Sequence, residues 1–301
     1  MSETQVNALP QWKNLQDHAA EMNQSHRHLK HLLQDPERLA TCSLRGGGLF
    51  YDYSRQRVVS DTMALLYSLA AVRQVNARFA QMISGEIVNP SERRAALHTA
   101  CRRFGDHPVW VDKQDVMPEI RTVREAVKRF CEQVHGGAVC GSTGKRFAHV
   151  VVVGIGGSYL GPECVARALQ SSADKGLRLH FLSNVDIDNF RAVIGAIDPE
   201  TTLWVVVSKS YTTVETLTNA NLAAQFMRDR GFDPLKHLVT VTAKGSPGDD
   251  PSNPALASFN MFDFIGGRYS VSSAVGAVPL SLYLGYDRFE RFLKGAEQMD
   301  Q

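Results

Sequence analysis

The sequence predicts an α/β protein in which a doubly wound parallel sheet, flanked by helices, follows a mainly helical N-terminal region. Apolar runs rich in β-branched residues, such as 149–153 and 203–207, are typical of strands buried on both faces. Between residues 149 and 242 such runs alternate with helical patterns, an order that folds into parallel strands with helices on both faces. Over residues 11–135 apolar side chains recur mostly at helical spacing.

The individual elements can be placed from local signals. A glycine turn and a short extended segment are expected over 46–55. Asn89 is a good N-cap and Pro90 suits the first helical position, which predicts a helix over 90–103. The expected strands are 149–153, 177–182, 203–207 and 237–242. Helices are expected at 165–169 and from Thr212 or Thr213, where Thr212 and Glu215 fit a capping box. A Pro/Gly/Asp loop is expected over 246–254.

Composition excludes several classes of protein. The 301 residues are 44% hydrophobic and 21% charged, as in globular proteins, and a net charge of +2 gives no case for nucleic-acid binding. No signal peptide and no apolar run long enough to span a membrane is evident. The five cysteines are odd in number and widely spaced, which indicates free thiols in a reducing compartment and no metal site. A cytoplasmic location is therefore expected.

The most informative stretch begins where the apolar run 203–207 ends. It continues with Ser208, Lys209 and Ser210 and reaches the next helix through Thr212 and Thr213. Hydroxyls, an ammonium group and a helix N-terminus together suit a phosphate group. Ser/Thr clusters at such turns more often cap the helix and bind nothing, so composition alone leaves the choice open.

Two other loops can be tested against nucleotide motifs. In the glycine-rich loop 154–161 Tyr159 stands where the dinucleotide fingerprint needs glycine, and the GK pair within 140–146 lacks the first P-loop glycine. Nucleotide cofactors are therefore disfavoured. What remains is a close backbone approach at Gly157 and a hydroxyl at Ser158, beside the next helix.

A third polar loop is Gly266-Gly267-Arg268, set among small and apolar residues. We expect the Arg268 guanidinium where solvent is scarce, either as a buried structural clamp or as a stabiliser of developing negative charge.

Five segments in order resemble the glucose-6-phosphate isomerase family, which has the sugar-isomerase (SIS) fold. They are 48–55, 85–102, 154–162, 208–216 and 266–276. The resemblance implies a mainly helical region over 1–135, a first SIS domain over 136–285, and over 286–301 the start of a helix leading to a second SIS domain.

The resemblance also implies a chemistry. Members interconvert glucose 6-phosphate and fructose 6-phosphate in glycolysis and gluconeogenesis through a cis-enediol(ate), without metal or cofactor. Arg268 would be catalytic by stabilising the enediolate. Gly157 and Ser158 would lie beside the sugar, and the phosphate cradle would comprise Ser208, Lys209, Ser210, Thr212 and Thr213.

The expected partners are a sugar phosphate and, at full length, a second copy in a homodimer, with no nucleic acid and no membrane. The sequence stops within a helical pattern, and the resemblance places the catalytic glutamate, a histidine and a lysine in the second domain. We therefore expect a truncated chain that is inactive alone. The alternatives are a non-catalytic phosphosugar-binding SIS module and, less favoured because of Tyr159, an NAD-dependent oxidoreductase.

Overall fold

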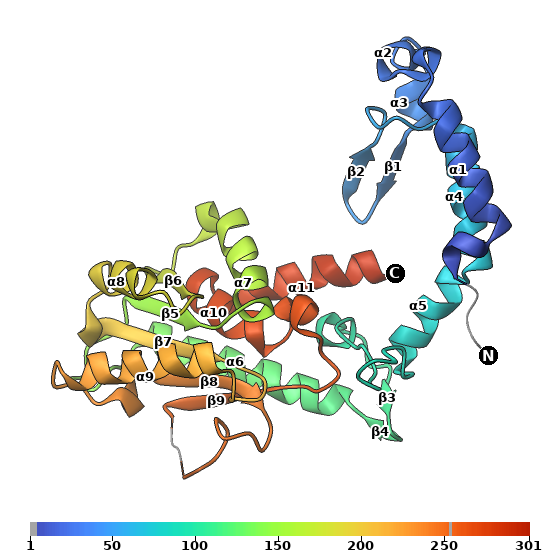
Figure 1. Cartoon of the computed structure of the whole chain (residues 1–301). Coiled ribbons are helices and arrows are strands. Elements are labelled where there is room, and N and C mark those ends of the chain that lie inside the picture. The colour runs from blue at the N-terminus through green and yellow to red at the C-terminus, as the bar shows by residue number, and fades with distance from the viewer. Residues whose placement is uncertain (1–4, 253–254) are drawn as a thin grey trace. The chain divides into compact units, whose positions relative to one another are not determined.

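The computed structural model describes residues 5–252 and 255–301, so the end of the predicted loop 246–254 lies outside the described residues. The chain divides into two compact units, an N-terminal unit up to residue 81 and an α/β unit over 82–301 (Figure 1). The predicted domain limits at 135/136 and 285/286 stay predictions.

The N-terminal unit is built from helices and one β-hairpin. Helix α1 (Pro10–Met22) packs against α4 (Ser60–Val72), with His18 Nε2 lying 2.7 Å from Thr62 Oγ1. The buried Arg38 guanidinium donates to the backbone carbonyls of residues 54, 56 and 58, which holds the chain after the hairpin. The other elements are α2 (Leu29–Leu32), α3 (Arg38–Thr41), β1 (Ser43–Gly46), β2 (Leu49–Asp52) and α5 (Val75–Ser84), which continues into the α/β unit. The hairpin confirms the predicted glycine turn.

Five parallel strands form the sheet of the α/β unit. They are β5 (His149–Val153), β6 (Arg178–Leu182), β7 (Thr202–Val207), β8 (Leu238–Ala243) and β9 (Ala257–Met261). Their spatial order is β6-β5-β7-β8-β9, a doubly wound order in which the chain reverses its direction of progress between β5 and β7. The four predicted strands are confirmed to within a residue or two. The fifth was missed because its sequence, ASFNM, alternates apolar and polar residues over only five positions and lacks the unbroken apolar run of the other strands.

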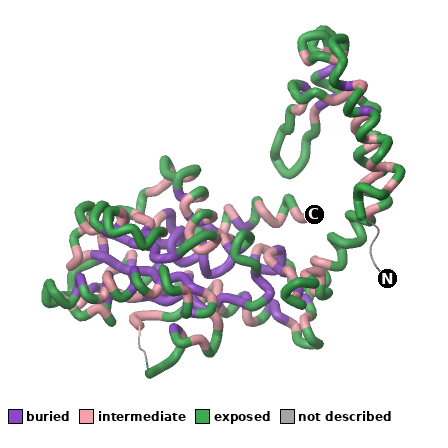
Figure 2. The backbone as a smooth tube through the Cα atoms, in the orientation of Figure 1, coloured by how far each residue is buried: buried purple, intermediate pink, exposed green. Residues whose placement is uncertain are grey.

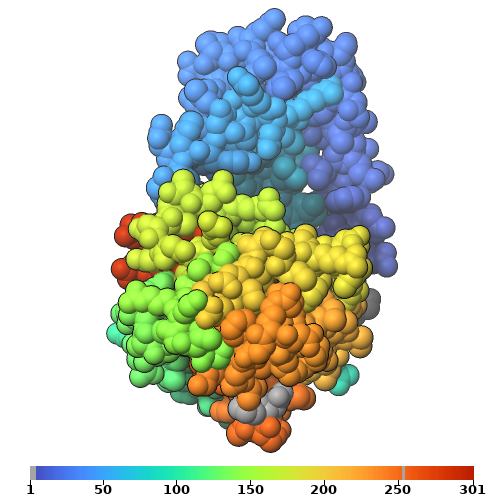
Figure 3. All heavy atoms as spheres, turned by 90° about the vertical axis from the view of Figure 1, so that its left-hand side faces the viewer, coloured from blue at the N-terminus to red at the C-terminus, as the bar shows by residue number. Residues whose placement is uncertain are grey.

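Helices cover both faces of this sheet, as predicted. One face packs against α6 (Met117–Gly136), α7 (Gly157–Ala168) and α10 (Ala274–Leu284), and the other against α8 (Ile187–Gly195) and α9 (Val214–Arg228). Buried residues concentrate in the strands and in α10 (Figure 2). Much of the yellow face in Figure 3 belongs to α8 and α9, which cover the strands on that side.

The predicted helix over 90–103 is wrong. The chain instead forms a tight loop in which Asn89 and Arg94 exchange backbone hydrogen bonds, and only a single 3₁₀ turn, Ala100–Arg102, follows. Asn89 does cap the tight loop 89–94, because its side chain accepts from the Glu92 N–H. The N–H of the fully buried Leu97 donates to the carbonyl of Phe264, so a tertiary contact replaces the bond that a helix would need.

The remaining elements complete the α/β unit. The predicted helix at 165–169 is the end of the longer α7 and its C-cap; α7 already begins at Gly157, because Gly156, with a φ of +59°, turns the chain soon after β5. A small antiparallel pair comprises β3 (Trp110–Val111) and β4 (Gln114–Asp115), and α11 (Tyr286–Asp300) follows Gly285. Helix α11 binds back to an early segment, since Glu297 accepts from the Phe104 N–H and Asp300 pairs with Arg102.

Candidate functional site

The candidate site lies at the carboxyl ends of β5 and β7. The loop after β5 leads into α7 on one face of the sheet, and the loop after β7 leads into α9 on the other. Loops that part in this way leave a crevice at the switch point of the strand order, which is where doubly wound sheets bind ligands. The predicted residues at 157–158 and 208–213 all come from these two loops.

The loop after β5 is held by close backbone packing. Gly156 has φ of +59°, a conformation that glycine adopts without strain, and Gly157 begins α7. A Cβ added at Gly157 would overlap the carbonyl oxygen of Gly267, so the two backbones touch. Ser270 Oγ lies 2.7 Å from that carbonyl oxygen and 3.3 Å from the Gly157 oxygen. The glycine loop is thereby joined to the segment that carries Arg268.

The loop after β7 presents hydroxyls in front of a helix N-terminus. Ser208 is buried, its N–H donates to the Val241 carbonyl, and its Oγ lies 3.4 Å from Thr213 Oγ1. Thr212 Oγ1 donates to Ser210 Oγ over 2.7 Å. Tyr211, between them, has a positive φ of 51° and packs its buried ring against Gly248. These hydroxyls therefore form two pairs within one loop, Ser208 with Thr213 and Ser210 with Thr212.

Helix α9 has an uncapped N-terminus. Thr213 is its N-cap, as one of the two predicted starts, and its side chain makes no capping hydrogen bond. The predicted capping box of Thr212 with Glu215 is wrong, because a helix capped by Thr213 has Glu215 at its second position and not at its third. Within the described part of the chain, the first N–H groups of α9 therefore stay open toward the hydroxyl loop. Such N–H groups favour an anion.

The Lys209 side chain turns away from these hydroxyls. Its Nζ donates to the Asp263 carbonyl at 2.8 Å and to the Ile265 carbonyl at 3.5 Å, and lies 3.5 Å from the Asp263 carboxylate. Burial lowers the pKa of Lys209, and the nearby Arg94 guanidinium lowers it further, while Asp263 opposes both. Sequence patterns did not predict that Asp263 and Arg94 lie beside Lys209, because these positions depend on tertiary contacts.

Arg268 is exposed, which corrects the expectation of scarce solvent. It lies in the 3₁₀ turn Gly267–Ser272, where residues 266–269 face outward and only the following serines are buried. Among residues 5–252 and 255–301, no side chain or carbonyl pairs with its guanidinium. Next to it, Tyr269 stacks on His98 with ring centroids 4.7 Å apart. Burial lowers the pKa of His98, so this ring is neutral in the stack.

Other features have structural roles. Asp186 caps α8 by accepting from the Asp188 N–H, and 140–146 is a loop that precedes β5. The five cysteines are free, and no group of three metal-ligating side chains occurs in the described residues. None of the helices described is long and apolar enough to cross a bilayer.

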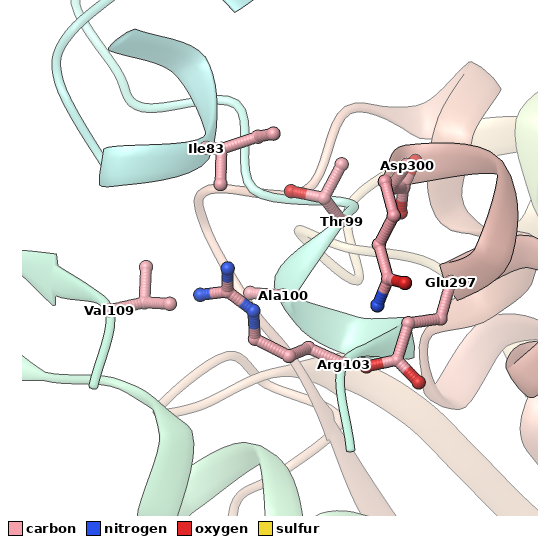
Figure 4. A pocket seen from close by; sticks show the side chains of 8 residues that line it. Ile83, Thr99, Ala100, Arg103, Val109, Glu297 and Asp300 are labelled. Carbon is pink, nitrogen blue, oxygen red and sulfur yellow. The ribbon is translucent and has the colours of Figure 1, made fainter. Parts of the chain in front are cut away.

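A separate cavity of about 60 Å³ lies between the 99–103 segment and α11. Figure 4 shows Arg103 extending into it, with Glu297 and Asp300 on one side. None of the predicted site residues lines this cavity.

The doubly wound sheet, its two helical layers and the loops at its switch point are those of an α/β protein with the sugar-isomerase fold. The family model described as phosphoglucose isomerase matches residues 52–301. The chain belongs to the phosphoglucose isomerase family.

Several relatives support this assignment. The chain is 59% identical to a glucose-6-phosphate isomerase of Desulfosudis oleivorans, over all of this chain and 56% of that protein. It is 40% identical to one of Methylococcus capsulatus, over 97% of this chain and 54% of the relative. A crystal structure of a glucose-6-phosphate isomerase from Chlamydia trachomatis superposes with a TM-score of 0.86 at 33% identity, covering 99% of this chain and 56% of the other. The chain thus spans about half the length of the curated relatives it matches.

Proposed function

We propose that this chain carries the phosphate-binding part of a glucose-6-phosphate isomerase, which interconverts glucose 6-phosphate and fructose 6-phosphate through a cis-enediol(ate). The observation that supports this most is the meeting of three loops at one edge of the sheet. The hydroxyl loop and the glycine loop flank the switch point, and the glycine loop touches the Arg268 segment at Gly157 and Gly267.

In this proposal the phosphate group is bound by the loop after β7. The hydroxyls of Ser208, Ser210, Thr212 and Thr213 donate hydrogen bonds, and the backbone N–H groups at the start of α9 add partial positive charge. Lys209 contributes its backbone N–H, because its ammonium group is bonded to the Asp263 and Ile265 carbonyls.

The sugar would lie beside Gly157 and Ser158, where the close packing of Gly157 on the Gly267 backbone brings the Arg268 segment next to the same loop. Arg268 stabilises the negative charge of the enediolate. Its unpaired, exposed guanidinium is available for this, and such electrostatic stabilisation is often worth about 3 kcal/mol. The proposed chemistry uses no metal and no cofactor.

We propose that the proton-transfer residues lie outside those assigned here. A polypeptide of these 301 residues should then bind sugar phosphate but turn it over poorly. A cytoplasmic location is part of the proposal, since a spinach relative, 40% identical, is named cytosolic. Assembly as a homodimer at full length is proposed as well.

The first experiment is isothermal titration of the 301-residue polypeptide with glucose 6-phosphate, glucose and inorganic phosphate. We expect glucose 6-phosphate and phosphate to bind and glucose not to. Ser208→Ala should weaken glucose 6-phosphate about tenfold, the low end for a hydrogen bond to a charged group. Ser258→Ala, which changes an exposed hydroxyl on β9, is the matched control. Equal affinity for glucose and glucose 6-phosphate, or no effect of Ser208→Ala, would contradict the proposed site.

Turnover is measured separately, by a coupled isomerase assay of the same polypeptide. Activity that exceeds that of an Arg268→Ala preparation purified in parallel would show that the proton-transfer groups are present in this chain. That result would overturn the proposed division of roles while leaving the phosphate site standing.

A further inference from the structure

The ammonium group of Lys209 is bound by groups of the 263–265 segment. A lysine ammonium has three N–H donors, and three acceptors surround this one: the carbonyls of Asp263 and Ile265 and the Asp263 carboxylate. The side chain is about two-thirds buried, with 32% of its surface exposed. A phosphate at the hydroxyl loop would therefore find the backbone of Lys209 but not its charge.

The backbone of Lys209 is fixed as firmly as its side chain. Its carbonyl accepts from the Ala243 N–H at 3.0 Å and from Thr242 Oγ1 at 3.3 Å, both at the end of the neighbouring strand β8. Because the backbone of Lys209 is bonded to β8 and its ammonium group to the carbonyls of Asp263 and Ile265, Lys209 links the position of those carbonyls to the sheet.

The Lys209 side chain binds residues 263–265, which form the start of the segment that carries Arg268. Three successive carbonyls are held there: Asp263 by Lys209 and by Arg94 Nη1 at 3.4 Å, Phe264 by the Leu97 N–H, and Ile265 by Lys209. Two glycines follow before Arg268. Glycine has the greatest backbone freedom of any residue, so the position of Arg268 depends on how well the chain is anchored just before them.

We propose that Lys209 is a positioning residue, which clamps the 263–265 backbone to the phosphate loop and so sets where Arg268 stands relative to the bound phosphate. Arg94 is the second arm of this clamp, since it contacts both the carbonyl and the carboxylate of Asp263. The inference rests on the proposed sugar-phosphate site for its purpose, but the clamp itself can be tested without any ligand.

The ligand-free test is hydrogen exchange of the 301-residue polypeptide carrying Lys209→Met, which keeps the length of the side chain and removes its donors. One reporter amide lies in the clamped segment and one just after it: the Ile265 N–H donates to the Phe262 carbonyl, and the Tyr269 N–H to that of Gly266. We expect their exchange to accelerate about tenfold, as for loss of a charged hydrogen bond. Lys244→Met is the matched control, because this lysine follows β8 at the same sheet edge and its ion pair with Glu119 is exposed.

The second test is titration with glucose 6-phosphate at about 0.01 M and about 1 M ionic strength, where the Debye length falls from roughly 30 to roughly 3 Å. A positioning role predicts that Lys209→Met weakens binding by the same factor at both salt concentrations. A direct charge contact with phosphate predicts a loss that shrinks at high salt.

The clamp is overturned if Lys209→Met leaves the exchange of both reporter amides at the wild-type rate, or if its binding defect disappears at high salt. If the unmodified polypeptide binds no glucose 6-phosphate, the proposed function fails. The exchange comparison then still decides whether Lys209 holds the 263–265 backbone.

Discussion

Gly157 and Gly267 meet in one backbone contact, yet a methyl group should destabilise the chain at Gly157 and have little effect at Gly267. A Cβ added at Gly157 would overlap the Gly267 carbonyl, well inside the 3.0 Å below which real Cβ atoms essentially never approach another atom. A Cβ added at Gly267 meets nothing within 4 Å. Neither glycine has a positive φ, so alanine carries no backbone strain at either one. Packing alone therefore distinguishes the two substitutions.

The size of the effect follows from overpacking. Inserting a methyl group into a packed contact costs about 1–3 kcal/mol when backbone must move. Alanine at the first position of α7 regains less than about 1 kcal/mol of helix propensity, which leaves a net cost of about 1–2 kcal/mol for Gly157→Ala. For a unit of this size each kcal/mol lowers the melting temperature by about 2–4 °C, so a fall of about 2–8 °C is expected. Gly267→Ala should stay within about 0.5 kcal/mol of the unmodified chain.

The assay is thermal unfolding of both variants side by side, followed by titration with glucose 6-phosphate. Gly157→Ala should also weaken binding, because separating the two backbones moves the glycine loop away from the Arg268 segment. Equal melting temperatures for the two variants would refute the reasoning, since the predicted contrast depends only on the contact between these glycines.

Three further predictions concern buried groups of the α/β unit. His237 is fully buried and neutral: its Nδ1–H donates to the Thr202 carbonyl, and its Nε2 accepts from the Ser142 N–H. Burial lowers the pKa of His237 below its unfolded value. The stability that the neutral ring contributes is therefore present above a pH of about 6.5 and is lost as the pH falls below that value. Urea unfolding at pH 7.5 and 5.5 should show a lower free energy of unfolding at pH 5.5, and an unchanged free energy would contradict this. Burial raises the pKa of the Cys101 thiol to about 12. A disulfide reagent at pH 8 should therefore label the exposed Cys164 rapidly and Cys101 only after unfolding. Equal labelling rates for the two cysteines in the folded chain would refute this. The indole N–H of Trp204 is buried without a partner in the described residues. Trp204→Phe should therefore cost at most about 1 kcal/mol of unfolding free energy and Trp204→Ala about 3–5 kcal/mol, as measured by chemical denaturation. A Phe variant as unstable as the Ala variant would be inconsistent with this packing.

The strands of the sheet could be predicted from the sequence because burial on both faces leaves a direct mark on composition. The run Leu203–Val207 contains no polar residue, and its position in β7 was correct to one residue. The strand Ala257–Met261 has a sheet neighbour on one side only and carries Ser258 and Asn260, so the same signal was absent.

The helix predicted over 90–103 shows where prediction from local sequence signals fails. Its local signals at Asn89 and Pro90 were sound, but they stabilise a single turn as well as a helix. The decision between the two came from the Phe264 carbonyl, which lies far along the chain and takes the Leu97 N–H. For the same reason the sequence indicated the polar loops of the site but neither the direction of the Lys209 side chain nor the exposure of Arg268.

The attachment of α11 to the 102–104 segment bears on how the chain folds as it is made. The bond from the Phe104 N–H to Glu297 joins residues 193 positions apart, and the Arg102–Asp300 pair joins residues 198 apart. At a ribosome adding about 5–20 residues per second, the early segment waits roughly 10–40 s for these partners. During that interval the carboxylates that complete its hydrogen bonds do not yet exist. The 102–104 segment therefore reaches its final contacts only after α11 has left the ribosome, however early the first strands pair.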